Sequence, residues 1–102
     1  MAIAQTDLSP NNWILIGDNV STITFQTLSQ FPVVIGVTTS NVGLASTAPG
    51  LVYKQYEGEL KRAVSDLSFE SSPTYVWAKA ISSYATVIYE TPWFYYEYQI
   101  TI

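Results

Sequence analysis

The chain has 102 residues, the size of one ordinary domain, and we predict a single domain over residues 1–102. It contains no cysteine and no histidine, which excludes disulfide frameworks, zinc fingers, iron–sulfur clusters, cysteine nucleophiles and histidine-based triads. The formal net charge is −4, and the four basic residues are Lys54, Lys61, Arg62 and Lys79. Because so few cations cannot neutralise a phosphate backbone, we expect no nucleic-acid partner.

The rest of the composition favours strands. Val, Ile, Thr and the aromatic residues make up more than two fifths of the chain, and all of them suit a pleated, half-buried surface. Charged residues reach only 12%, about half the usual share. The sequence therefore predicts an all-β protein, a single antiparallel β-sandwich of jelly-roll or Ig-like type with an aromatic C-terminal strand.

The start of the chain lacks the features of an export signal. Residues 1–7 have neither a positive stretch nor an apolar one, as a secretory signal would. The longest apolar run, residues 31–37, is much shorter than the roughly 20 residues that cross a bilayer. We therefore expect a soluble protein that is made without export and has no membrane partner.

The first third of the chain alternates between turn signals and short strand-like runs. Residues 20–27 carry Ile23 and Phe25 on one side and polar residues on the other, which is typical of a strand with one wet face. The predicted elements are a turn at 7–12, a strand at 13–16, a turn at 17–19 and a strand at 20–27.

Residues 31–38 are apolar on both faces, which predicts a central strand. Pro32 stands near its start, where a missing N–H group is tolerated. Gly36 within the run indicates a bulge or a close backbone approach. A polar connection follows at 40–50, and residues 51–56 form the next predicted strand.

Residues 56–69 leave two interpretations open. Leu60, Val64 and Leu67 have helical spacing, which favours a helix. Residues 59–64 are also compatible with a charged edge strand followed by a short helical turn.

The C-terminal part contains three predicted strands. Residues 74–81 and 84–90 flank Ser82 and Ser83, and we predict that these two strands form a hairpin. After Pro92, residues 93–102 are predicted to form a final strand.

Few side chains are candidates for chemistry. Glu57 and Glu59 lie two residues apart, so in a strand they share one side, and paired carboxylates hydrolyse glycosides. The competing interpretation, a charged sheet edge, is favoured. Asp18 and Asn19, with Asp7, Asn11 and Asn12 upstream, offer oxygen ligands for calcium, but Asp and Asn also occur in ordinary turns. The sequence therefore predicts no enzyme, no cofactor and no metal site.

The feature that stands out is a group of aromatic residues close to the C-terminus. In an extended chain Phe94, Tyr96 and Tyr98 share one face, and Trp93 and Tyr95 share the other. The segment has three possible roles, which are core closure, a subunit interface and stacking on sugar rings. The residues that we assign to an interface are Trp93, Phe94, Tyr95, Tyr96 and Tyr98.

Two motifs carry a resemblance to a known class of protein. The run Tyr75-Val-Trp-Ala-Lys-Ala80 followed by Ala85-Thr-Val-Ile-Tyr89 resembles the terminal hairpin of small virion proteins of tailed bacteriophages. Residues 13–38 are similar to these proteins in general pattern. The resemblance implies a non-enzymatic β-sandwich that decorates or cements a capsid, or joins fibre and tail parts.

The same resemblance implies partners and a location. Proteins of this kind are homotrimers or subunits tiled on a shell, so the expected partners are other virion proteins and further copies of the chain, with a trimer favoured. The expected location is the virion, after synthesis in the host cytoplasm. The alternative function is a carbohydrate-binding module for host attachment, which the many Tyr, Trp, Ser, Thr and Asn residues favour.

Overall fold

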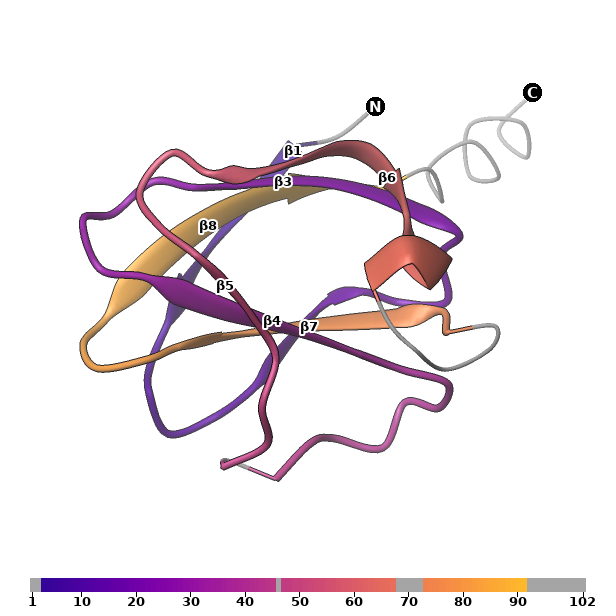
Figure 1. Ribbon diagram of the computed structural model, residues 1–102, viewed down its shortest axis with the longest axis horizontal. Helices are drawn as coiled ribbons and strands as arrows, with labels where there is room; N and C mark the ends of the chain where they lie inside the picture. The colour runs from indigo at the N-terminus through magenta and orange to yellow at the C-terminus, as the bar shows by residue number, and fades with distance from the viewer. Residues whose placement is uncertain (1–2, 46, 68–72, 92–102) are drawn as a thin grey trace.

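The computed structural model describes residues 3–45, 47–67 and 73–91 (Figure 1). These residues form eight strands and one short 3₁₀ turn. The elements are β1 (Ile3–Leu8), β2 (Ile14–Gly17), β3 (Thr22–Thr27), β4 (Val33–Thr38), β5 (Leu51–Tyr53), β6 (Gly58–Ala63), η1 (Val64–Leu67), β7 (Tyr75–Ala80) and β8 (Ala85–Glu90).

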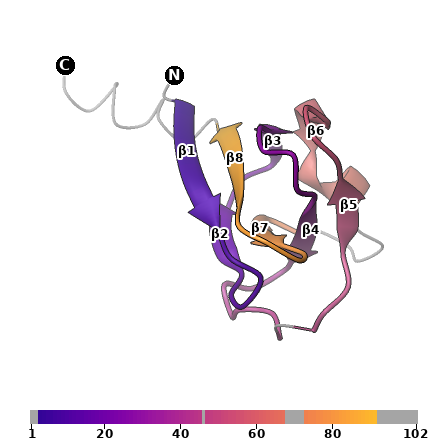
Figure 2. The same ribbon diagram turned by 90° about the vertical axis from the view of Figure 1, so that its left-hand side faces the viewer.

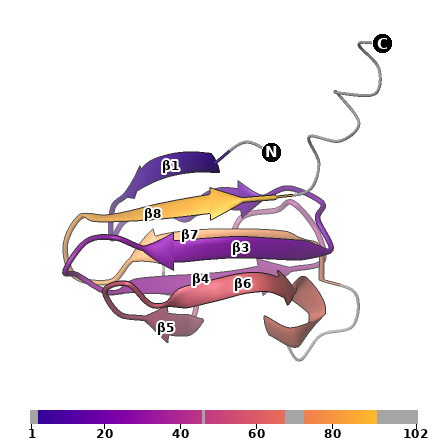
Figure 3. The same ribbon diagram turned by 90° about the horizontal axis from the view of Figure 1, so that it is seen from above.

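The strands form two four-stranded antiparallel sheets packed face to face. Sheet A has the order β1-β8-β3-β6, and sheet B has the order β2-β7-β4-β5. Figure 2 shows the two sheets as separate layers, and Figure 3 shows the four strands of sheet A side by side. The prediction of an all-β antiparallel sandwich is therefore confirmed. The predicted strand at 93–102 lies outside the described residues.

The strands pair in a nested pattern. The first strand pairs with the eighth, the second with the seventh, the third with the sixth and the fourth with the fifth. Two further pairings, β3 with β8 and β4 with β7, complete the sheets. Among the described strands only β4 and β5 are neighbours both in sequence and in a sheet.

The core lies between the sheets and is almost entirely aliphatic. Strand β3 contributes Ile23 and Phe25, which are buried, while Thr22, Thr24 and Gln26 point to the other side. The predicted alternation of this strand is confirmed. The other buried core residues are Leu8, Ile16, Val20, Val33, Ile35, Val64, Val76, Ala78, Ala80, Ala85 and Val87.

The predicted hairpin of residues 74–81 and 84–90 is wrong. Both strands exist, but β7 belongs to sheet B, between β2 and β4, whereas β8 belongs to sheet A, between β1 and β3. The connection around Ser82 and Ser83 therefore crosses from one sheet to the other. Strands β2 and β4 occupy both edges of β7, so no edge of β7 is left for β8. The burial of every residue from Val76 to Ala80 agrees with this central position.

Other segments follow the sequence more closely. Residues 56–69 contain strand β6 followed by the turn η1, so the strand interpretation is confirmed and the helix interpretation is wrong. Residues 31–38 contain β4, which is a central strand as predicted. Strand β1 was not predicted at all. No helix among the described residues has the length and apolar character needed to cross a membrane.

Thr27 fixes the connection between β5 and β6 to the end of β3. Its side chain is fully buried, and its hydroxyl donates a hydrogen bond to the carbonyl oxygen of Lys54. Its amide donates to the carbonyl of Glu57 over 2.9 Å, and its own carbonyl accepts from the amide of Tyr56 over 2.8 Å. One polar side chain therefore anchors a turn that links the two sheets.

Replacing Thr27 with valine is expected to lower the free energy of unfolding by about 1 kcal/mol, because the shape is kept but the part-buried hydrogen bond to the carbonyl of Lys54 is lost. Urea unfolding followed by circular dichroism measures the change. Thr39→Val is the matched control, since Thr39 is exposed. Equal effects of the two substitutions would show that the buried hydroxyl has no special role.

Candidate interaction surface

Glu57 and Glu59, the candidate carboxylate pair, have different partners. A carboxylate oxygen of Glu57 accepts a hydrogen bond from the amide of Lys54 over 2.7 Å, which closes the turn between β5 and β6. The carboxylate of Glu59 accepts from the hydroxyl of Tyr53 over 2.9 Å and from Nε of Arg62 over 2.9 Å. Glu59 therefore belongs to a charged sheet edge as interpreted, whereas Glu57 lies in the turn before β6 and not in the strand.

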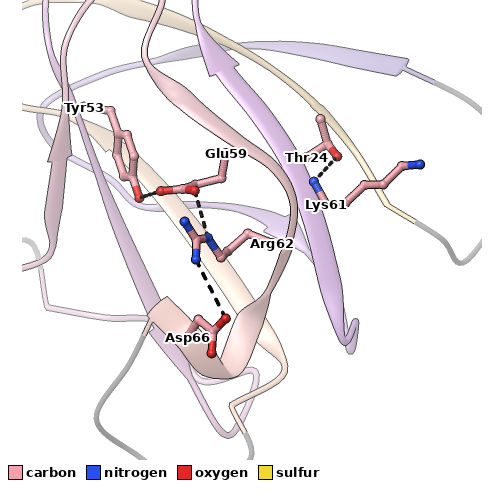
Figure 4. A network of polar contacts seen from close by, with 6 residues as sticks. All are labelled: Thr24, Tyr53, Glu59, Lys61, Arg62 and Asp66. Atoms are coloured by element: carbon pink, nitrogen blue, oxygen red, sulfur yellow. Dashed lines mark hydrogen bonds and ion pairs between the residues drawn. The ribbon is translucent and has the colours of Figure 1, made fainter.

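Glu59 belongs to a polar network that joins the edges of the two sheets (Figure 4). Tyr53 of β5 donates to it from sheet B, and Arg62 of β6 holds it from sheet A. Arg62 also reaches Asp66 over 3.8 Å. Both members of this last ion pair are largely exposed, so it contributes little to stability. The Tyr53 ring meets Phe25 edge-to-face at 4.9 Å, which ties the network to the core.

The network predicts a dependence of stability on alkaline pH. Burial raises the pKa of Tyr53 above its usual value of 10.0, and the hydrogen bond to the Glu59 carboxylate raises it further. Because the folded pKa exceeds the unfolded one, the stabilisation is complete below about pH 10 and is lost as the pH rises above that value.

Tyr53→Phe removes this hydroxyl. At about pH 8 the variant is expected to be less stable than the native chain by about 1 kcal/mol, and the difference should shrink at about pH 11. The two proteins differ only in this hydroxyl group, so the difference between their urea-unfolding curves isolates the contribution of Tyr53. A difference that stays constant over this range would contradict the assignment.

The candidate calcium ligands do not converge. Asp7 accepts a hydrogen bond from the hydroxyl of Thr86 over 3.2 Å. Asp18 and Asn19 lie in the connection between β2 and β3, where Asn19 has a φ of 58°. Within residues 3–45, 47–67 and 73–91, no three acidic side chains are grouped as metal ligands would be. Asp18 and Asn19 therefore have the position of ordinary turn residues.

The outer face of sheet B is covered by the connection between β4 and β5, which the sequence indicated only as a polar link. Trp13 donates from its indole nitrogen to the carbonyl of Ala45 over 2.8 Å, and Trp77 donates to the hydroxyl of Thr38 over 2.9 Å. We call this group the outer cluster. Its members are Trp13, Val34 and Trp77, with Leu15, Leu44, Ala48 and Tyr75 packed against them.

Gly36 makes room for the outer cluster. A Cβ atom at this position would lie 2.7 Å from Leu44 and 3.3 Å from the ring of Trp13. Of the two alternatives predicted for Gly36, the bulge is wrong, because the register of β4 with β7 is unbroken at this residue. The atoms that approach Gly36 closely belong to the side chains of Leu44 and Trp13 and not to the backbone. Lys79 is also buried on this face, with its ammonium 5.6 Å from the centre of the Trp13 ring.

Packing in the outer cluster buries two of the tryptophans and leaves other aromatic residues exposed to a partner. Trp13 and Trp77 are buried, so neither offers a flat ring to a ligand. The exposed aromatic residues of the described chain are Phe31, Tyr56 and Tyr84, with exposed fractions of 37%, 66% and 70%. Each of them lies in a connection between strands.

These three connections lie at one end of the sandwich, the left side of Figure 3. They are joined by hydrogen bonds, because the amide of Leu28 donates to the carbonyl of Thr86 over 2.9 Å and the side chain of Gln55 donates to the carbonyl of Leu28 over 3.2 Å. Exposed aromatic side chains are common in binding surfaces. We call this end, with Phe31, Tyr56, Ile81 and Tyr84, the aromatic loop end.

The aromatic loop end was not predicted from the sequence. Its three aromatic residues lie in three different connections, more than twenty positions apart in the sequence, so no local pattern marks it. The only available signal is a bulky aromatic residue inside a turn. The interface residues that were predicted, Trp93, Phe94, Tyr95, Tyr96 and Tyr98, lie outside the described residues.

The four sheet edges differ in their openness to another strand. Strand β2 has four residues and an irregular register after Leu15, and β5 has only three residues. Strand β6 is interrupted by a bulge opposite Thr24, where Lys61 has a φ of 49°. Only β1 has six residues in unbroken register with its partner, from Ile3 opposite Glu90 to Leu8 opposite Ala85.

A shallow hollow of about 130 Å³ lies beside the start of β1. It is mainly apolar, and Ile3, Ile88 and Tyr89 contribute to it together with Thr24, Phe25, Gln26 and Glu90. Ile3 is 70% exposed. The lining of the hollow, as far as residues 3–45, 47–67 and 73–91 form it, contains no paired carboxylates.

Comparison of the chain with protein-family models, with curated proteins and with solved structures finds no match.

Proposed function

We propose that the protein is a non-enzymatic structural virion protein with a jelly-roll fold, a capsid decoration or cement subunit or a head- or tail-associated subunit. In this proposal it binds the assembled shell and neighbouring copies of itself, with a trimer favoured. It is made in the host cytoplasm and is carried in the virion.

The observation that carries the proposal is the nested pairing of the strands. A jelly roll can be described as a long hairpin that is rolled up. Its first strand pairs with its last, its middle strands pair with each other, and its eight strands divide into two sheets of four. The described strands follow this order. An Ig-like sandwich has a different strand arrangement. Jelly rolls build viral capsid domains and lectins, and the argument from fold to function is here an analogy at the level of the fold.

The contacts of the acidic residues also support a structural role. Glu57 and Glu59 are engaged in a turn and in a network between the sheets, and the aromatic loop end offers apolar surface to a partner. A subunit that binds only the assembled lattice adds its binding free energy to the stability of that lattice by mass action. The proposed mechanism is therefore thermodynamic and needs no catalytic residue.

Co-sedimentation with capsids from the source of the sequence tests this function. The purified chain should pellet with capsids and saturate at a fixed number of copies per particle. Tyr84→Ala in the aromatic loop end should weaken the binding, whereas Leu60→Ala, an exposed apolar residue on β6, is the control. A chain that stays in the supernatant and is absent from purified virions by mass spectrometry would refute the proposal.

A carbohydrate-binding function for host attachment is the second candidate. Two observations favour it: lectins share the jelly-roll architecture, and Tyr56 and Tyr84 present exposed rings in connections at the same end of the sandwich. A glycan array distinguishes the two functions. Saturable binding that is lost in Tyr84→Ala, Trp93→Ala or Tyr95→Ala would place this function above the first.

A further inference from the structure

We propose that the C-terminal segment, residues 93–102, of one copy adds as a strand to the free edge of β1 in a second copy. This inference deepens the self-association part of the proposed function by naming the surface that receives the partner. It concerns the purified chain alone, so a failure of capsid binding would leave it intact.

The first argument is the contrast among the four sheet edges. Proteins block exposed edges with short strands, bulges and charges. In the described chain β5 is short, β2 and β6 have register shifts, and β6 also carries Glu59, Lys61 and Arg62. Strand β1 has none of these protections except Asp7 near its end. It therefore offers an open ladder of the kind that β-strand addition uses.

The second argument is the match between the two faces of β1 and the sequence of the segment. On the core side of β1, Ala4, Thr6 and Leu8 face the inner residues of β8. A strand beside them needs apolar residues at alternate positions, and the segment supplies these from Phe94 to Ile102.

On the outer side, β1 presents Ile3 beside the apolar hollow and then the polar Gln5. The second face of the segment has the same mixed character, because it carries Trp93 and Tyr95 together with polar residues. The composition of the segment thus fits an edge that is apolar on the core side and mixed on the outer side. Because side chains alternate between the two faces of any strand, this match holds for a parallel and for an antiparallel addition.

The third argument favours a second copy over the chain's own edge. Strand β8 ends at Glu90, opposite Ile3, with β1 between it and the free edge. The chain would have to cross β1, a distance of about 10 Å or two strand spacings, and reverse its direction. A proline disfavours the helical conformation for the residue before it, and Pro92 follows Thr91 in the sequence. A reversal of the chain would therefore need further residues, which would then be lost for pairing. A segment from another copy meets no such constraint.

The contact is head-to-tail, since each copy gives one segment and one β1 edge. Such heterologous contacts generate closed rings when the rotation closes. This agrees with the trimer that is favoured for the self-association.

Light scattering coupled to size-exclusion chromatography gives the first test. The full chain should be oligomeric. A chain that ends at Thr91, which keeps this buried residue, should be monomeric with an unchanged β-sheet circular dichroism spectrum. In the full chain, Tyr96→Pro should weaken association by at least about tenfold, because proline cannot donate to the ladder. A monomeric full chain, or a truncated chain that still associates, would overturn the inference.

Cysteine cross-linking gives the second test and needs no truncation. The native chain has no cysteine, so each engineered pair reports alone. A Gln5→Cys chain is mixed with a tagged copy that carries Glu97→Cys, Gln99→Cys or Tyr98→Cys. Disulfides between copies should form with position 97 or 99, which share the outer face, and not with position 98.

Val52→Cys on the β5 edge replaces Gln5→Cys in the control and should give no cross-link. Equal yields at 97, 98 and 99 would indicate non-specific contact of aromatic residues and would overturn the strand addition. Cross-links that form only within one chain carrying both cysteines would show that the segment covers its own β1 edge, which also overturns the inference.

Discussion

Replacing Gly58 with alanine is expected to cost about 4 kcal/mol or more of folding free energy, enough to unfold a small domain. A Cβ atom at this position would lie 1.9 Å from the carbonyl oxygen of Phe25 and 2.8 Å from the Cα atom of Gln26. Both atoms belong to the backbone of β3. Since no side chain can move aside, β6 would have to leave the edge of sheet A.

Gly43→Ala is the matched control for Gly58→Ala, because a Cβ atom on Gly43 would meet nothing within 4 Å. Circular dichroism and urea unfolding of the two variants test the expectation. The control should unfold at nearly the native urea concentration. If Gly58→Ala did the same, the close pairing of β6 with β3 at this point would be disproved.

Replacing Trp77 with alanine is the second large expected effect, a loss of about 3–5 kcal/mol. Trp77 is a central member of the outer cluster, and its indole donates to the hydroxyl of Thr38. Its removal leaves a cavity between sheet B and the connection that covers this sheet. We therefore expect faster proteolysis within residues 39–50 in addition to a lower unfolding midpoint in urea.

Two further variants test whether the loss of stability comes from the buried ring of Trp77 and its hydrogen bond. Trp77→Phe keeps much of the ring but loses the hydrogen bond, so its loss of stability should be smaller than that of alanine. Tyr84→Ala removes an exposed ring and should change stability by less than about 0.5 kcal/mol. If Trp77→Ala behaved like Tyr84→Ala, residues 39–50 would not depend on the outer cluster.

The sequence predicted strands well where one face is wet and the other is buried. Ile23 and Phe25 alternate with polar residues in β3, and the burial follows this pattern. Strand β1 escaped prediction because most of its side chains are exposed or only partly buried and only Leu8 is fully buried. The extended conformation of this edge strand depends on its hydrogen bonds to β8, and a pairing between residues so far apart produces no local pattern in the sequence.

Pairing was harder to predict than the strands themselves. Residues 74–81 and 84–90 were expected to form a hairpin because a short link usually joins paired strands, yet they belong to different sheets. The same reasoning would have failed at almost every connection of this fold. The outer cluster shows a related limit, since Trp13, Leu44 and Trp77 are brought together only by the three-dimensional arrangement.

The candidate site was predictable only in part. The involvement of Glu59 in a charged edge followed from the sequence, but its partner Tyr53 comes from the other sheet. The aromatic loop end draws its members from three separate connections. Sites assembled from distant turns in this way carry no spacing signal in the sequence.

The nested pairing also constrains the order in which the protein folds. The β4–β5 pair closes a short loop, whereas the β1–β8 pair joins Ile3 to Glu90 across nearly the whole chain. Closing long loops costs more chain entropy, and folds dominated by distant pairings form in milliseconds to seconds. We expect β1 and β8 to pair last. The β1 edge and the exit point of residues 93–102 would then come into place together at the end of folding, so a newly made chain folds before its segment can add to the β1 edge of another copy.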